Sequence, residues 1–564
     1  MPTFSDLLKG HYESIPNKIC VTILHAGQPD RPVSYSELLN GSAGYVKSYQ
    51  GNGVQPGDVI LLILQHGIDL LYAYYGAILL GAIPSIMPFL TEKLLPDRYR
   101  ADLAGLVSIS RPTAIVTYPD FEFEVQAAIK PDRDSVKTVI VTDHVESPCL
   151  PQFQLFGGLL RKPEDIALLQ HSSGTTGLQK GVALSHQAVI NQLTNYAKAI
   201  QLTGNDVFIS WLPLYHDMGL IACWLMPILM GYPLVLMSPF DWIRAPYRLL
   251  QTVSKYKGTL SWLPNFAYNF SAQKIRDRDL EGVDLSTWRV ISNCSEPMRW
   301  ESHNAFYERF QNLGLRFESL CTCYAMAENV FAVTQGGVNA PVFCEDIDRD
   351  TLQTKNVAQA AKPGQTVVRM MGTGKPIKNT KIQIIDNKGQ VLPDRHVGEV
   401  SVHSDCMLTG YYHREDATKK AFLDGWYLTG DYGYLVDEEL FITGRKKDLI
   451  IIGGKNIFPQ DLEILAYEVP GVHPGRASAF GVFNEITGTE DVVLVAEVDV
   501  DDPEKRYNIA DEIRASITRG SAVALRYVHL VHHPWLVKTS SGKTARSANR
   551  EKFLQEMQTK GQQY

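Results

Sequence analysis

The sequence predicts an α/β fold, with a large N-terminal body of several subdomains followed by a small, mobile α+β domain. Short apolar and β-branched runs alternate with helical patterns early in the chain, at 59–64, 114–118, 138–142 and 234–237. Strands separated by helices pair in parallel through right-handed crossovers and build layered α/β domains. From about residue 381 the pattern changes to closely spaced strands joined by turns, which indicates a small β subdomain within the body.

The apolar stretch 70–91 is long enough to raise the question of a membrane span. Gly76, Gly81 and Pro84 interrupt it. We therefore expect a buried helix that ends near Leu80 and a short strand after it, and no membrane span.

Strand patterns at 381–386 and 398–404, with a turn at Asn387-Lys388-Gly389, form the first hairpin of the expected β subdomain. A further strand pattern occupies 439–444. The preceding segment, Cys344–Met371, is polar and weakly periodic. We interpret it as an excursion from the main fold.

The pattern of strands and helices in the last part of the chain indicates an independent unit. Strand patterns at 492–500 and 527–533 are separated by helical patterns, and a short polar helix follows Arg546. We expect a body of residues 1–443 and a mobile C-terminal domain of residues 444–564.

Composition narrows the class of protein. Of the 564 residues, 45% are apolar and 20% are charged, as in an average globular protein. The net charge of −7 argues against a general nucleic-acid binder, which needs a basic surface. Eight cysteines are too few for a disulfide scaffold, and the N-terminus lacks the apolar core of a secretory signal. These features predict a cytoplasmic protein.

A glycine-rich segment at 169–182, LQHSSGTTGLQKGV, carries the strongest chemical signal. Its glycines allow a sharp turn that brings backbone N–H groups near an anion, and its hydroxyls and lysine suit a polyphosphate. The spacing is not that of a Walker loop, and 541–544 also fails that pattern because Val537 stands where a glycine is required. The candidate phosphate-binding residues are Ser172, Ser173, Gly174, Thr175, Thr176, Gly177 and Lys180.

Further motifs follow in a fixed order, and together they resemble the acyl-adenylating superfamily over about residues 34–546. They are YAMAE at 324–328, GTGKP at 372–376, GEV at 398–400, GYY at 410–412, YLTGD at 427–431, GRKKD at 444–448 and TSSGK at 539–543. The resemblance implies that a carboxylic acid attacks ATP to give acyl-AMP and pyrophosphate, with Mg²⁺ on the phosphates. Such a reaction brings anions together, so positioning and charge neutralisation should dominate catalysis.

The resemblance also implies a role for each matching residue. Lys543 is similar to the catalytic lysine that bridges the substrate carboxylate and the α-phosphate. Asp431 matches the carboxylate that accepts from both ribose hydroxyls, and Arg445 resembles the arginine that also reaches the ribose. Tyr324 would flank the adenine.

Two further roles concern the metal and the hinge. Glu328 matches the magnesium ligand, because a hard cation prefers oxygen, and Thr175 is a second oxygen candidate. Lys447 occupies the family's hinge position, where the C-terminal domain rotates between two poses.

Three features resemble the fatty acyl-AMP ligase branch of the superfamily: WLPLYHDMGL at 211–220, LPNFAY at 263–268 and an insertion at about 346–371. In that branch the insertion is thought to limit domain movement and disfavour CoA. The resemblance implies transfer to the phosphopantetheine of a separate acyl carrier protein. His216 is a second catalytic candidate, although it and 264–268 also suit a protein core.

The residues leave the acid open. Domains that activate amino acids carry an Asp directly after an aromatic residue, whereas here His216 follows Tyr215 and Asp217 falls one position late. An uncharged, apolar-tailed acid is therefore expected. Candidate lining residues, which core packing explains equally well, are Phe240, Trp242, Trp262, Phe266 and Tyr268.

Departures from the family pattern keep other acids under consideration. Ala325 replaces a usual glycine, and Asn329-Val330-Phe331 and Cys294-Ser295-Glu296-Pro297 replace common strings. A short, branched or aromatic acid is an alternative substrate, and an acyl-CoA synthetase that uses free CoA is the alternative enzyme. A non-catalytic sensor is disfavoured because Lys543, Asp431 and Glu328 are all present.

Overall fold

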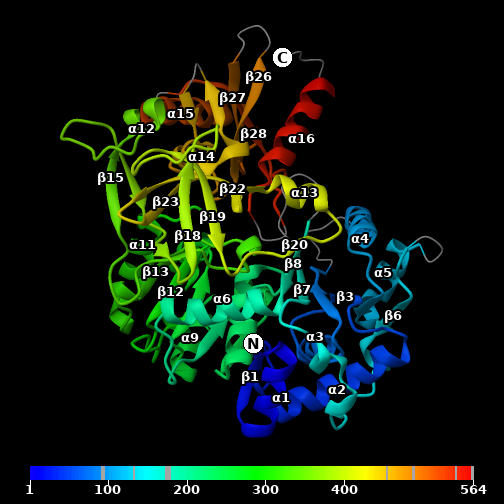
Figure 1. Cartoon of the computed structure of the whole chain (residues 1–564). Helices are drawn as coiled ribbons and strands as arrows, with labels where there is room; N and C mark the ends of the chain where they lie inside the picture. The colour runs from blue at the N-terminus through cyan, green and yellow to red at the C-terminus, as the bar shows by residue number, and fades with distance from the viewer. Residues whose placement is uncertain are drawn as a thin grey trace.

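The computed structural model confirms the predicted α/β class (Figure 1). It describes residues 1–89, 96–130, 134–171, 180–452, 455–484, 489–521, 523–539 and 543–559. Most of the glycine-rich segment, residues 172–179, lies outside the described residues.

The body is built around a seven-stranded sheet. Its order is β13 (Leu320–Cys323), β12 (Val290–Cys294), β11 (Leu260–Leu263), β9 (Phe208–Ser210), β10 (Leu234–Met237), β1 (Ile19–Leu24) and β2 (Arg31–Ser34). Neighbouring strands are parallel except β1 and β2, which are antiparallel. Strands β10, β11 and β12 are buried along their whole length, because helices cover a parallel sheet on both faces.

A second sheet is wholly parallel, with the order β4 (Ile83–Ile86), β3 (Val59–Ile63), β5 (Ala114–Thr117) and β6 (Thr138–Val141). These strands coincide with the predicted apolar runs. Between β3 and β4 lies α3 (Ile68–Leu80), which ends at Gly81 in the left-handed conformation, φ 86°. Among the helices that the structure describes, none has the length and apolarity to cross a membrane.

The predicted β subdomain forms a five-stranded sheet. It contains β18 (Thr380–Ile385), β19 (Gly398–Ser404), β22 (Trp426–Val436), β21 (Phe422–Leu423) and β23 (Glu439–Arg445). A smaller sheet of β20 (Gly410–Tyr411), β8 (Gly181–Ser185) and β7 (Ile166–His171) flanks the glycine-rich segment.

The excursion at Cys344–Met371 is a hairpin with a helix. Its strands β15 (Cys344–Asp348) and β16 (Val367–Met371) are antiparallel, and α12 (Arg349–Lys355) follows β15. Helix α12 contacts β25 (Lys455–Ile457) in the last part of the chain. Figure 1 shows α12 at the upper left, beside the C-terminal elements.

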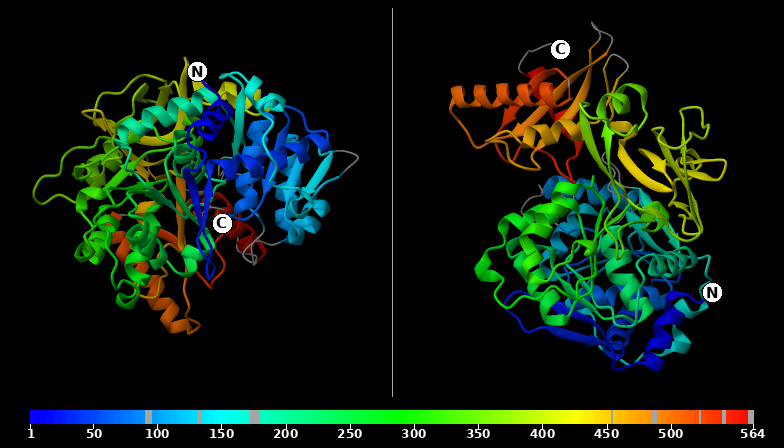
Figure 2. Two further views of the ribbon diagram at one scale, coloured as in Figure 1. Left: turned by 90° about the horizontal axis from the view of Figure 1, so that it is seen from below. Right: turned by 90° about the vertical axis from the view of Figure 1, so that its left-hand side faces the viewer.

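The C-terminal elements have their own sheet and apolar cores. The sheet is β26 (Ala477–Asn484), β27 (Thr489–Glu497) and β28 (Leu525–Val531), with α14 (Pro459–Tyr467), α15 (Pro503–Ser521) and α16 (Arg546–Thr559). Two clusters of buried side chains draw only on residues after 449, and Figure 2 shows these elements at one end of the molecule. The boundary at 443/444 stays a prediction, and it lies within β23.

Further helices of the body pack around these sheets. They are α1 (Phe4–Ser14), α2 (Tyr35–Gly51), α4 (Pro96–Ser110), α5 (Glu122–Ala128), α6 (His186–Ala199), α7 (Met226–Met230), α8 (Pro239–Arg244), α9 (Tyr247–Tyr256), α10 (Asn265–Lys274), α11 (Trp300–Phe310) and α13 (Glu415–Lys420). β14 (Thr334–Gln335) pairs with β17 (Lys375–Pro376), and β24 (Ile450–Ile452) pairs with β25.

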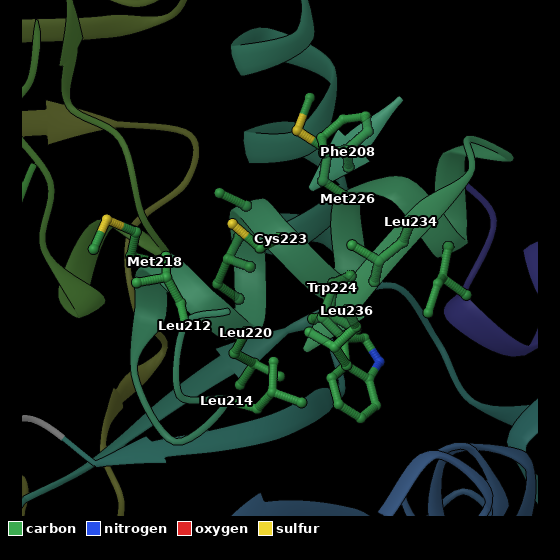
Figure 3. Close-up of a cluster of buried hydrophobic side chains, with 14 of the residues drawn as sticks. Phe208, Leu212, Leu214, Met218, Leu220, Cys223, Trp224, Met226, Leu234 and Leu236 are labelled. Carbon is green, nitrogen blue, oxygen red and sulfur yellow. The ribbon is translucent and has the colours of Figure 1, made fainter. Parts of the chain in front are cut away.

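A π-helical segment, Met218–Leu225, fixes the motif that precedes it against the main sheet. Its side chains are buried, and Figure 3 shows Met218, Cys223 and Trp224 in one cluster with residues of β9 and β10. Burying side chains of this size stabilises the fold by about 1.5–3 kcal/mol each. Residues 215–217 are thereby held next to the end of β9.

Candidate active site

Three predicted motifs begin where parallel strands of the main sheet end. Residues 211–217 follow β9, residues 295–297 follow β12, and residues 324–328 follow β13. The carboxyl ends of parallel strands lie at one edge of a sheet, where α/β proteins bind their ligands. The strand order therefore brings the three motifs to a common edge.

Three of the predicted nucleotide-binding residues meet at this edge. The Tyr324 hydroxyl donates to Asp431 Oδ2 at 2.6 Å, and Arg445 Nε lies 3.5 Å from Asp431 Oδ1. Asp431 and Arg445 are partners in the β22–β23 ladder. Burial, and next the Asp431 charge, raise the pKa of Tyr324, so its hydroxyl stays protonated as a donor. The Asp431 side chain keeps 18% of its surface exposed and can accept from a ligand.

Glu328 and Lys180 meet around a tyrosine. The Tyr411 hydroxyl donates to Glu328 Oε1 at 2.9 Å and lies 3.0 Å from the Tyr427 hydroxyl. Lys180 Nζ lies 4.6 Å from the centre of the Tyr411 ring, a cation–π distance. Burial raises the pKa of Glu328, so a neighbouring cation would stabilise its charged form. The sequence motif GYY at 410–412 predicted no role for Tyr411.

The turn after Glu328 is strained. Val330 has φ 63° and ψ −53°, and Phe331 N donates to Asn329 O at 2.6 Å, which makes a γ-turn that a β-branched residue rarely adopts. Asn329 Nδ2 also donates to Ala332 O at 2.7 Å. Such strain costs about 1–3 kcal/mol and persists where the surroundings impose it. The unusual Asn329-Val330-Phe331 string thus shapes the segment that holds Glu328.

Lys543 reaches the same edge from the C-terminal elements. Electrostatic interactions link its ammonium group to Arg445, Glu296 and Asp217. Burial, and next the Arg445 charge, lower the pKa of Lys543. Glu296 Oε2 accepts from Phe266 N at 2.9 Å at the start of α10. The predicted catalytic lysine and Arg445 therefore share one electrostatic environment.

His216 is a buried, neutral imidazole. Burial, and next the Lys543 charge, lower the pKa of His216 to about 3. Its Nε2 is buried and has no hydrogen-bond partner among the described residues, so the structure offers no support for a satisfied core histidine. Asp217 caps the π-helical segment by accepting from Met218 N at 2.8 Å, and burial raises its pKa.

Lys447 follows β23 in the short turn Lys446–Asp448. Burial, and next the Arg445 charge, lower the pKa of Lys447. Beside it, Lys446 Nζ pairs with Glu399 Oε2 at 2.7 Å. This places the predicted hinge residue at the junction between the β subdomain and the C-terminal elements.

The aromatic candidates for the acyl pocket divide into two groups. Trp262 Nε1 donates to Tyr196 at 2.8 Å and Tyr268 donates to Ile291 O at 3.0 Å, so the core explains both. Phe240 and Phe266 are 37% and 39% exposed. Trp242 stacks on Trp211 with ring centres 3.6 Å apart, and Phe266 packs edge-to-face against both rings.

Some predicted residues lie outside the described residues. They are Ser172, Ser173, Gly174, Thr175, Thr176 and Gly177. Within the described ranges, no group of three or more His, Cys, Asp or Glu side chains could hold a metal ion. Glu328 remains the predicted carboxylate ligand for a cation carried on phosphates.

The layered α/β body, with Tyr324, Asp431 and Arg445 in mutual contact and Lys543 electrostatically linked to Arg445, has the features expected of an adenylate-forming enzyme. The family described as AMP-binding enzyme matches residues 11–412, and the chain belongs to that family. It is an acid-activating, AMP-forming ligase.

Three similar proteins indicate where in the family the chain lies. The medium-chain-fatty-acid–[acyl-carrier-protein] ligase JamA of Moorena producens is 30% identical, over 98% of this chain and 96% of its own. A putative acyl-CoA synthetase of Caulobacter vibrioides is 28% identical, over 94% and 91%. A solved structure from a study of fatty acyl-adenylate ligases of E. coli and L. pneumophila is 28% identical with a TM-score of 0.88, over 99% and 98%.

Proposed function

We propose that this protein activates an apolar carboxylic acid, a fatty acid in the first instance, and passes it to the phosphopantetheine thiol of a separate acyl carrier protein. The observation that carries the proposal is the hydrogen-bonded and ion-paired set of Tyr324, Asp431 and Arg445, with the Lys543 ammonium close enough to Arg445 to interact with it electrostatically. A cation that interacts with the residues resembling a ribose site supports an attack on the α-phosphate of a bound nucleotide. The names of JamA and of the fatty acyl-adenylate ligases support the same reaction.

In the first step an oxygen of the substrate carboxylate attacks the α-phosphorus of ATP. The bond from that phosphorus to its bridging oxygen breaks, and pyrophosphate leaves with the electron pair. Asp431 and Arg445 orient the ribose, Tyr324 flanks the adenine, and Lys543 holds the carboxylate and the α-phosphate together. Positioning and charge neutralisation of this kind supply most of the acceleration in such transfers.

Phosphates and magnesium would be held by the glycine-rich segment, Lys180 and Glu328, the last two of which both contact Tyr411. Lys180 and the hydroxyls of Ser172, Ser173, Thr175 and Thr176 suit the phosphates. Mg²⁺ bound to ATP usually needs one or two carboxylates besides phosphate oxygens and water, and Glu328, with Thr175, fits that requirement. The ion would neutralise charge on the phosphates when bound.

In the second step the thiol sulfur attacks the acyl carbon, AMP leaves, and the thiol proton passes to solvent. We propose that residues 444–564 rotate about Lys447 between the two steps. Asp217 already accepts a hydrogen bond from the helical segment that it caps and interacts electrostatically with Lys543. It is therefore poorly placed to pair with the ammonium group of an amino-acid substrate, so an acid with an apolar tail suits the site better. A cytoplasmic setting suits eight cysteines that are all free.

To test this proposal, the protein is incubated with ATP, Mg²⁺ and each of a panel of medium-chain, long-chain, branched and aromatic acids. The release of pyrophosphate is measured for each acid. We expect release with a subset of the apolar acids. The preferred acid is then offered with either free CoA or a phosphopantetheinylated carrier protein, and the acyl thioester is measured by mass. Transfer to the carrier that greatly exceeds acyl-CoA formation supports the proposal.

An acyl-CoA synthetase is the second candidate, because the Caulobacter relative bears that name. Acyl-CoA formation as fast as transfer to the carrier would favour it. Release of pyrophosphate with aromatic or branched acids alone would show that the substrate is not a fatty acid, but it would still support the acid-activating step.

A further inference from the structure

Lys543 stands on a short antiparallel hairpin whose described strands are residues 537–539 and 543–545. Ala545 N donates to Val537 O at 3.1 Å, and Thr539 N donates to Lys543 O at 2.8 Å. Lys543 N donates to Thr539 Oγ1 at 3.1 Å. Because Thr539 engages both backbone groups of Lys543, the first strand of the hairpin determines where the lysine stands.

A buried amide holds the base of that strand. Asn549, in the first turns of α16, has 0% of its surface exposed. Its Oδ1 accepts from Val537 N at 2.7 Å and its Nδ2 donates to Val537 O at 3.0 Å. A primary amide is the side chain that can donate and accept in this way at once, so Asn549 replaces the ladder partner that an edge strand lacks.

A buried carboxylate holds the two residues that precede Val537. Glu497, at the end of β27, is 0% exposed. Its Oε1 accepts from Trp535 N at 2.8 Å and from Leu536 N at 2.7 Å, and its Oε2 accepts from Arg476 Nη1 at 2.7 Å. Burial alone would raise the pKa of this carboxyl, but the Leu536 N–H, Arg476 and Trp535 N–H hold it below its ordinary value. Glu497 is therefore ionised at neutral pH.

The two side chains together fix three consecutive backbone N–H groups, those of residues 535–537. The chain of contacts runs from the C-terminal sheet through Glu497 and Asn549 to the hairpin, and through Thr539 to Lys543. A charge-assisted hydrogen bond is about twice as strong as a neutral one, so this anchor is stiffer than a solvated loop would be.

We propose that Glu497 and Asn549 are positioning residues that set the place of the Lys543 ammonium during acyl-AMP formation. They act through the backbone of the hairpin. The inference rests on the proposed function, in which Lys543 acts in the first step and residues 444–564, which carry it, rotate before the transfer to thiol. A misplacement of about 1 Å can cost about 100-fold in rate, so loosening the anchor should slow the first step alone.

The experiment measures both half-reactions in one sample of the full-length protein. Pyrophosphate release from ATP and the preferred acid reports acyl-AMP formation, and acylation of a phosphopantetheinylated carrier from supplied acyl-AMP reports transfer. Asn549→Asp keeps the shape but removes the donor to Val537 O. We expect it to lower the first rate by about 10–100-fold and the second by less than twofold. Loss of folded protein would lower both rates equally and leave their ratio unchanged.

Glu497 offers a matched pair of variants. Glu497→Gln retains an oxygen that accepts from Trp535 N and Leu536 N, so it should keep most of the first rate. Glu497→Leu removes the acceptor and should lower the first rate like Asn549→Asp. Finally, Asn549→Asp should have no further effect on the first rate in a Lys543→Ala background, because a residue that acts through Lys543 has nothing left to position.

An unchanged ratio of the two rates in Asn549→Asp protein that circular dichroism shows to be folded would overturn this inference but not the proposed function. An undiminished effect of Asn549→Asp in the Lys543→Ala background would do the same. Absence of pyrophosphate from the unsubstituted protein with every acid would overturn the proposed function, and this inference with it.

Discussion

The hydroxyl of Tyr324 donates to Asp431 Oδ2 at 2.6 Å and joins two separate sheets. Tyr324 follows β13 of the main parallel sheet, whereas Asp431 lies in β22 of the β subdomain. The next strand, β23, carries Arg445 and leads directly to Lys447. The candidate nucleotide site and the candidate hinge are thus built on one stretch of chain.

Removing this hydrogen bond should weaken ATP binding. Tyr324→Phe deletes a donor to a charged acceptor, which is worth about 1.5–3 kcal/mol, so we expect KM for ATP to rise about 10-fold with little change in kcat. Tyr432→Phe is the matched control, since its hydroxyl contacts Asn387 in the exposed turn. Equal KM values in the two variants would remove Tyr324 from the nucleotide site.

Glu328 should govern the response to magnesium. Burial raises the pKa of this carboxyl, and a bound cation would offset the cost of its charge. Glu328→Gln should raise the Mg²⁺ concentration for half-maximal pyrophosphate release by about 10-fold or more. The exposed Glu415→Gln should not. A magnesium titration of Glu328→Gln that overlays that of the unsubstituted protein would contradict the assignment.

His216 should act as a neutral hydrogen-bonding group. With its pKa lowered to about 3, the imidazole carries no charge from pH 5 upward, so its titration should leave no inflection in kcat/KM for the acid between pH 5 and 8. His216→Gln, which keeps a polar group, should retain more activity than His216→Phe. An inflection near pH 6 that disappears in His216→Gln would show a protonated histidine instead.

Asp461, on α14, should make the protein less stable as pH rises. Burial raises its pKa to about 6, in spite of Arg299, Arg349 and Arg546, and with Glu463 adding to the rise. Unfolded aspartate titrates at about 3.9, so between about pH 4 and 6 the folded state binds more protons and stability falls as pH increases.

The variant Asp461→Asn tests this sign. The Tm of the unsubstituted protein minus that of Asp461→Asn should be about 2–5 °C lower at pH 7 than at pH 4.5. The Tm of the exposed variant Asp511→Asn should change with pH as that of the unsubstituted protein does. A Tm difference from Asp461→Asn that stays constant with pH would contradict the raised pKa.

The sequence allowed good prediction of the strands, because buried parallel strands are nearly continuous apolar runs. The run at 114–118 becomes β5 (Ala114–Thr117) and that at 234–237 becomes β10. The pairing of Tyr324 with Asp431, which are 107 residues apart, has no local signal. Only the ordered motifs of a known family placed both residues in one site.

Other features could not be predicted. Glu497 and Asn549 are buried polar residues, and in a sequence they look like solvated ones, because burial arises from tertiary packing. The strained turn at Val330 follows from contacts of Asn329 that no pattern encodes. Aromatic residues serve a core and a pocket equally well, so Trp262 and Tyr268 joined the candidate acyl lining although their hydrogen bonds tie them to the core.

The most direct test of the account is the rate of pyrophosphate release from ATP and Mg²⁺, with and without the preferred acid, in the unsubstituted protein and in Lys543→Ala. The account predicts release that depends on the acid and falls by about 10²–10⁴-fold in Lys543→Ala. The exposed Lys505→Ala should remain fully active. Release that needs no acid, or that proceeds unchanged in Lys543→Ala, would contradict it.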